Sequence, residues 1–218
     1  MKKTIALNRF DIIIRDPQIA DIVEKVCNIS QFEGVNYVSS ILSGDTPFGI
    51  PTNPRNSSKN SIDIYADKTP EHSTIVHYLN EKNKRTHAYV SINDISKNTN
   101  DVNRPKVFLP KASGTGNDPQ VLGEPIVEKA NSVCSQTFIY AAFNSIEECY
   151  NFVSYIKTKF VRILVASIKM TQDCLSGVFR FVPLQDFSRP WTDADLYAKY
   201  GLTDDEIQFI ESMIKPME

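Results

Sequence analysis

The amino-acid sequence predicts an α+β fold in which a mixed sheet of short strands packs on one long central helix, followed by a short helical C-terminal tail. Three observations predict it: an apolar stripe at helical spacing over residues 146–169, short segments rich in β-branched and aromatic residues upstream, and repeated helix-capping signals near the end of the chain. The chain has 218 residues, 41% of them hydrophobic, which suffices for a packed interior. We therefore expect a single domain over 1–218, with a β-rich lobe over 1–144 and a helical lobe over 145–218.

The N-terminal region predicts a strand followed by a helix. Residues 9–15, Arg-Phe-Asp-Ile-Ile-Ile-Arg, have the composition of a strand. Asp16 and Pro17 follow as an N-cap and a first helical residue, and apolar residues at helical spacing come next. Residues 43–61 contain three prolines and two glycines, which predicts a long loop.

Short strands are expected between this loop and the C-terminal third. Each candidate is rich in β-branched or aromatic residues and is bounded by polar turns. The predicted strands are 62–66, 87–92, 106–109, 137–142 and 178–182. Residues 93–103 are expected to form an exposed connection.

The strongest helix signal covers residues 146–169. Ser145 and Glu148 form a capping-box pattern, and apolar residues recur every three to four positions after them. Lys159, Arg162 and Lys169 fall roughly in line on another face of this helix. Such a stripe is either an ordinary solvated face or a docking surface.

The tail repeats the capping pattern twice. Thr192 with Asp195 predicts a short helix that ends at Gly201. Thr203 and the glutamate three residues later predict a last helix, which Pro216 ends.

Composition and spacing exclude several classes of protein. No apolar run approaches the roughly 18 residues of a membrane helix, so we expect a soluble, cytoplasmic protein. The four cysteines are scattered without a C-x-x-C pair, which favours buried reduced thiols. The three histidines, His72, His77 and His87, lack the spacing of a metal site.

Sequence signals for catalysis are also missing. No lysine has an acidic residue two positions before it, as the commonest restriction nucleases require, and no G-x-S-x-G occurs. Amino-methylating enzymes use an Asn/Asp-Pro-Pro-aromatic tetrapeptide, whereas Asn53-Pro54-Arg55 lacks the second proline and the ring. If the chain serves a methylation reaction, it does not carry the chemistry.

Charge is unevenly distributed although the net charge is only -2. Residues 82–111 contain seven basic and two acidic residues, 152–180 contain five and one, and 186–218 contain three and eight. A molecule with one basic side can bind a polyanion because the local potential acts within about 8 to 10 Å. Asn, Gln and Arg in the neighbouring loops are the types that contact base edges.

Several segments resemble the C-terminal region of type II restriction-modification adenine-specific DNA methyltransferases. The segments that carry the resemblance are 8–16 (NRFDIIIRD), 47–52 (PFGIPT), 106–114 (KVFLPKASG), 154–160 (SYIKTKF), 182–187 (VPLQDF), 191–193 (WTD), 196–197 (LY), 199–203 (KYGLT) and 210–217 (IESMIKPM). The resemblance spans nearly the whole chain and is most specific in the last third.

The resemblance implies a target recognition domain that grips double-stranded DNA and selects the site to be methylated. The catalytic domain, supplied in cis or in trans, would bind S-adenosylmethionine and hold the flipped adenine. One position departs from the family pattern: Asp45 stands where a basic residue usually precedes Thr-Pro-Phe-Gly. This departure implies a weaker DNA contact at this loop or contact with a different base.

The basic loops and the end of the long helix are the expected DNA-binding elements, clamping phosphates and placing amide and guanidinium groups on base edges. The candidate residues are Asn53, Arg55, Lys59, Arg104, Lys106, Lys111, Ser113, Lys159, Arg162, Lys169, Thr171 and Gln172.

Two alternatives remain at this point. The basic helix face could dock an acidic protein partner, which would make the chain a stand-alone interaction module. A nuclease with an unrecognised site would most plausibly use the carboxylates of Asp63, Asp67 and Glu71.

Overall fold

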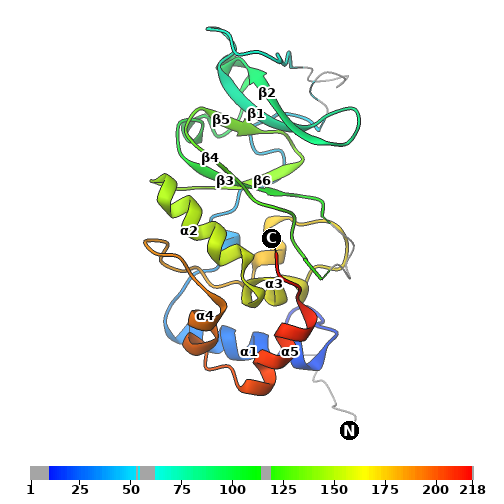
Figure 1. Cartoon of the computed structure of the whole chain (residues 1–218), viewed down its shortest axis with the longest axis vertical. Helices are drawn as coiled ribbons and strands as arrows, with labels where there is room; N and C mark the ends of the chain where they lie inside the picture. The colour runs from blue at the N-terminus through cyan, green and yellow to red at the C-terminus, as the bar shows by residue number, and fades with distance from the viewer. Residues whose placement is uncertain (1–9, 53, 55–61, 114–118, 218) are drawn as a thin grey trace.

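The computed structural model describes residues 10–52, 54, 62–113 and 119–217 (Figure 1). The fold is α+β, as predicted, and the described residues form five α-helices and two small three-stranded sheets. Three predicted DNA-binding residues, Asn53, Arg55 and Lys59, lie outside the described residues.

Helix α1 spans Pro17–Phe32 and begins as the sequence predicts. The Asp16 carboxylate accepts hydrogen bonds from the backbone N–H groups of Gln18 (2.8 Å) and Ile19 (3.2 Å). The two tail helices, α4 (Asp193–Lys199) and α5 (Asp204–Met213), each begin with a complete capping box, which confirms both predictions.

The single long helix over 146–169 is not observed. Helix α2 (Ile146–Lys157) and helix α3 (Lys159–Ala166) are separated by Thr158, whose backbone is extended (φ -62°, ψ 149°). The Thr158 hydroxyl accepts a hydrogen bond from the Val161 N–H, so this residue starts a new helix while it ends the first one. Apolar periodicity continues through the break, and therefore it could not reveal the change of direction.

One sheet has the strand order β2-β1-β5. Strands β1 (Thr74–Leu79) and β2 (Arg85–Val90) form an antiparallel hairpin, and β5 (Ser132–Cys134) runs parallel to β1. The second sheet has the order β4-β3-β6, with β4 (Ile126–Glu128) and β6 (Phe138–Ala142) both antiparallel to β3 (Lys106–Pro110).

The predicted strands 106–109 and 137–142 correspond to β3 and β6, and the predicted strand 87–92 overlaps β2, which ends at Val90. Three other strand predictions are wrong. Residues 10–15 form no strand, residues 62–66 contribute only a bridge between Tyr65 and Tyr89, and the segment at 178–182 begins within the short 3-10 helix Ser176–Phe179. Strand composition was present in each case, but among the described residues the pairing of these segments with other strands does not extend beyond the single bridge of Tyr65 to β2.

The β4-β3-β6 sheet separates two hydrophobic cores. Val107 and Leu109 of β3 join a large core with the helices, whereas Phe108 between them faces a smaller core shared with the β2-β1-β5 sheet. All five residues of β3 are buried. Figure 1 shows the resulting order along the long axis: the β2-β1-β5 sheet, the β4-β3-β6 sheet, α2 and α3, and then α1, α4 and α5.

Candidate functional site

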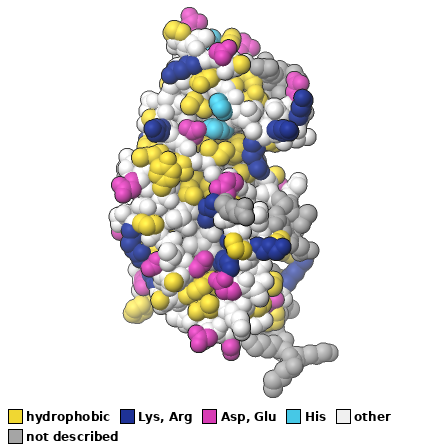
Figure 2. Space-filling view, viewed as in Figure 1, with side chains coloured by type: hydrophobic (Ala, Val, Ile, Leu, Met, Phe, Trp, Pro, Cys, Tyr) yellow, Lys and Arg dark blue, Asp and Glu magenta, His cyan; other side chains and the backbone are white. Residues whose placement is uncertain are grey.

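A cleft of about 170 Å³ lies between the β1–β2 hairpin and the segments that follow β3 and α3. We call it the hairpin cleft. Its lining consists of Thr52, Leu79, Arg85, Lys111, Ala112, Gln136, Thr137 and Asp173. In the space-filling view the molecule is indented on the hairpin's side, and Lys and Arg side chains border the indentation (Figure 2).

The hairpin wall of the cleft is held by a turn that one side chain organises. The Asn80 carboxamide oxygen accepts hydrogen bonds from the backbone N–H groups of Lys82 (2.9 Å) and Lys84 (3.0 Å). Asn83 adopts a left-handed conformation (φ 55°), which asparagine tolerates better than most residues. The exposed lysines of this turn therefore stand on a fixed backbone, directly before Arg85.

The opposite wall is a short ladder between two segments distant in sequence. Ala112 and Asp173 form a β-bridge, the Cys174 N–H donates to the Lys111 carbonyl (2.6 Å), and the Ser113 N–H donates to the Gln172 carbonyl (3.2 Å). This ladder brings four predicted DNA-binding residues together at the cleft or beside it: Lys111, Ser113, Thr171 and Gln172.

The two cations that line the cleft differ in their partners. The Lys111 ammonium lies 2.5 Å from a carboxylate oxygen of Asp45, and this hydrogen bond lowers the pKa of Asp45. Arg85 instead donates from Nη2 to the Ala112 carbonyl (2.7 Å), across the cleft, and forms no ion pair with a described residue. Partial burial lowers the pKa of Arg85 from its usual value.

Three predicted DNA-binding cations are buried and bind backbone carbonyls. Lys106 donates to the carbonyls of Val102 and Arg104 and to the Ser132 hydroxyl, and burial lowers its pKa to about 8. The Arg162 guanidinium donates to four carbonyls, those of Lys157, Thr158, Gln120 and Lys215. The Lys169 ammonium bonds the carbonyls of Ser113 (2.7 Å) and Val121 (2.5 Å), so it supports the cleft wall from inside.

The remaining predicted cations form ion pairs on the surface. Lys159 pairs with Glu211 of α5, and Arg104 pairs with Asp101 at 3.0 Å. Because Arg162 and Lys169 are buried and Lys159 is paired, these three side chains do not form the exposed basic helix face that a protein-docking module would use.

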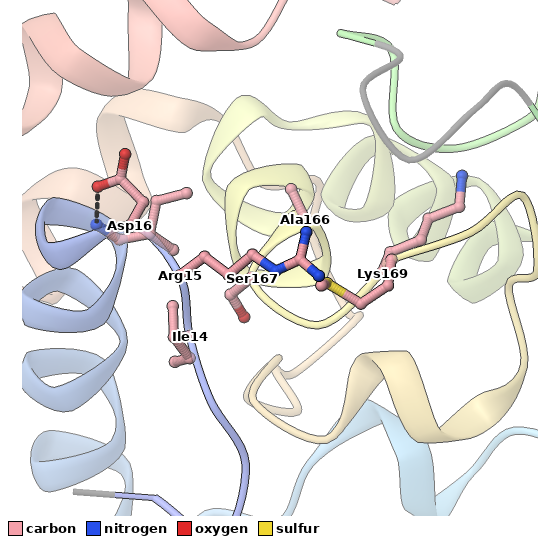
Figure 3. Close-up of a pocket in the computed structure, with 8 residues that line it drawn as sticks. Ile14, Arg15, Asp16, Ala166, Ser167 and Lys169 are labelled. Atoms are coloured by element: carbon pink, nitrogen blue, oxygen red, sulfur yellow. Dashed lines mark hydrogen bonds between the residues drawn. The ribbon is translucent and has the colours of Figure 1, made fainter. Parts of the chain in front are cut away.

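A second pocket of about 140 Å³ lies between the segment before α1 and the end of α3. Arg15 extends across it towards Ser167, and the Lys169 ammonium points away from Arg15 (Figure 3). Met170 lines this pocket and Asp173 lines the hairpin cleft, so the segment 170–173 connects the two.

Sequence reasoning missed Arg85, Gln136 and Thr137 as site residues, and it included Asp173 only as the last residue of the segment 169–173, which was expected to contact DNA. Arg85 belongs to the basic stretch 82–111, and its position after a polar turn was the available signal. Gln136 and Thr137 carried no signal, because they reach the cleft through pairings between distant segments.

Within 10–52, 54, 62–113 and 119–217, no three His, Cys, Asp or Glu side chains are arranged to hold a metal ion. The exposed carboxylates of Asp63, Asp67 and Glu71 are part of that range. No helix in the same range is long and apolar enough to cross a membrane.

Comparisons of the chain with protein-family models, with curated proteins and with solved structures found no match.

Proposed function

We propose that the chain is a DNA target recognition domain that serves an adenine-specific methyltransferase, and that the hairpin cleft contacts the DNA. The observation that carries this proposal is the convergence of Lys111, Ser113, Thr171 and Gln172 with Arg85 at the hairpin cleft or beside it. Guanidinium, amide and hydroxyl groups on fixed backbone are the groups that bind phosphates and base edges. The cleft alone is smaller than a duplex, so it would receive a base edge or a phosphate while the rims contact the backbone.

The hairpin turn supports the same proposal. Lys82 and Lys84 are exposed and form no ion pair with a described residue, and they belong to the turn between Leu79 and Arg85, which both line the cleft. The catalytic step would belong to a partner domain that binds S-adenosylmethionine, because the sequence carries no methyltransferase tetrapeptide.

The test is binding of the purified chain to a randomised duplex pool at about 50 and 200 mM salt, with the retained DNA sequenced. We expect enrichment of a short site and a steep loss of affinity with salt, about 0.9 in log K per log salt for each phosphate contact. A Lys82→Ala/Lys84→Ala variant should show a smaller salt slope. Lys68→Ala/Lys129→Ala is the matched control, because both lysines are exposed and form no ion pair with a described residue. Lys68 follows the Tyr65–Tyr89 bridge at the opposite end of β2 from the turn, and Lys129 follows β4 at the far edge of its sheet from β6.

Absence of binding at low salt to any duplex, with and without an added methyltransferase catalytic domain, would contradict the proposal. If the salt slope falls by the same amount in the control variant as in Lys82→Ala/Lys84→Ala, the turn lysines contribute only general electrostatic attraction. The cleft would then have no specific role in DNA binding.

A further inference from the structure

Arg85 has a fixed orientation at the cleft and unused hydrogen-bonding capacity. It is the first residue of β2 and lies opposite Leu79 of β1. One guanidinium nitrogen is held by the Ala112 carbonyl, and that carbonyl is fixed in turn by the ladder with residues 172–174. A guanidinium has five N–H donors in a rigid plane, so most of them remain for a ligand.

Asp173 provides the complementary group. Its carboxylate belongs to the residue that pairs with Ala112, and it lines the same cleft as Arg85. The two side chains form no ion pair with each other within 4.0 Å among the described contacts. Both therefore remain free to bind groups of opposite polarity on one ligand.

The arrangement discriminates between a phosphate and a base pair. A phosphate beside Arg85 would also meet the negative charge of Asp173, which disfavours it, whereas the Asp45 carboxylate is paired with Lys111. A G·C pair presents the acceptors O6 and N7 of guanine next to the N4 donor of cytosine in the major groove. Arginine binds the first two in a bidentate manner, and aspartate accepts from the third.

We propose that Arg85 and Asp173 together recognise one G·C base pair, with Arg85 on guanine and Asp173 on cytosine. This inference rests on the proposed function and adds a specific base pair to it. The recognised site then contains a G·C pair at a position that these two residues determine.

The experiment repeats the randomised-duplex selection with the wild type, Arg85→Ala, Arg85→Lys and Asp173→Ala. The wild type should select a motif with at least one invariant G·C pair. Arg85→Ala should lower affinity for that motif by about ten- to hundred-fold and relax the preference at that position only. Asp173→Ala should relax the same position.

Arg85→Lys separates base recognition from phosphate binding. Lysine keeps the charge but loses the planar fork, so a phosphate contact would survive and bidentate binding of guanine would not. Wild-type affinity and an unchanged motif in Arg85→Lys, or an unchanged motif in Arg85→Ala, would overturn the inference while the proposed function stands. Failure of the wild type to bind any duplex at low salt, with and without an added methyltransferase catalytic domain, would overturn both. Thermal unfolding of each variant establishes that the compared proteins are folded, and Asp173→Ala leaves the backbone ladder intact.

Discussion

The pair formed by Asp45 and Lys111 sets how much positive charge the hairpin cleft presents. The Lys111 side chain is mostly buried and its ammonium contacts the Asp45 carboxylate, which is more than half exposed. A carboxylate in this position competes with any phosphate for the same ammonium. The Asp45 carboxylate therefore directly lowers the positive charge that Lys111 offers to a ligand.

Asp45→Asn should increase affinity for duplex DNA. The amide removes the competing charge, so Lys111 becomes available for a phosphate and the salt slope should rise by up to about 0.9. Titrations at about 50, 100 and 200 mM salt measure this change. Lys111→Met should lower affinity, and the double variant should match Lys111→Met. Equal affinities for Asp45→Asn and the wild type would argue against a phosphate contact at Lys111.

The buried Lys106 makes stability depend on pH in a defined direction. Its pKa is about 8 in the folded protein, against about 10.4 in an unfolded chain. Between these two pH values the unfolded chain binds more protons than the folded protein. This group therefore makes the free energy of unfolding increase as the pH rises from about 8 to about 10.4.

Lys106→Met tests this dependence. The unfolding free energy of the wild type minus that of the variant should increase by about 2 kcal/mol from pH 8 to pH 10. Chemical denaturation of both proteins at each pH gives the difference, in which titration of the buried thiols and tyrosines largely cancels. A difference that does not change with pH would show that the Lys106 pKa is close to normal.

At the scale of elements, Thr158 converts one predicted helix into two. Its hydroxyl accepts from the Val161 N–H (3.2 Å) and donates to the Tyr155 carbonyl (2.7 Å). Both bonds are local, yet they lie inside a continuous apolar stripe. The break redirects α3 so that it packs with α1, α4 and α5.

Thr158→Ala should lower the free energy of unfolding by about 1 to 2 kcal/mol, because the N-cap bond of α3 is lost. Thr158→Ser keeps the hydroxyl and serves as the matched control, with a smaller expected effect. Denaturant unfolding of the three proteins measures both. If alanine and serine are equally destabilising, the hydroxyl does not provide the stabilisation.

Features held by bonds between residues close in sequence were predictable, and features held by contacts between distant segments were harder to predict. The starts of α1, α4 and α5 were predictable because capping bonds join residues two or three positions apart. Strand β5 was missed, because its pairing with β1 depends on residues more than fifty positions away. For the same reason, a count of cations could not distinguish Lys106 and Arg162, which bind carbonyls inside the protein, from Lys82 and Lys84, which stay exposed.

At the scale of the whole molecule, β3 couples two cores. Val107 and Leu109 enter the large core, and Phe108 between them enters the small core. All five residues of the strand are buried, so neither face of β3 is exposed to solvent. A defect on either face therefore loosens the same hydrogen-bonded strand. We expect the helical layer and the β1–β2 hairpin to unfold together.

Val107→Ala and Phe108→Leu test this coupling, with each expected to cost about 1 to 3 kcal/mol. The single tryptophan, Trp191, belongs to the large core and reports on it by fluorescence, while amide exchange in the hairpin reports on the small core. Both variants should shift both signals to the same extent. A Phe108→Leu variant that speeds exchange in the hairpin without moving the Trp191 transition would reveal two independent units.

The turn at residues 80–84 has a consequence for engineering. Its backbone is fixed by the Asn80 side chain and by hydrogen bonds between the main-chain groups of Asn80, Asn83 and Lys84. None of these bonds uses the side chains at positions 81, 82 and 84, which point to solvent. A library randomised at these three positions without proline, with Asn80 and Asn83 retained, would keep these bonds, because only proline lacks the N–H that positions 82 and 84 donate to Asn80. The turn is thus a natural place to select altered binding preferences without redesigning the interior.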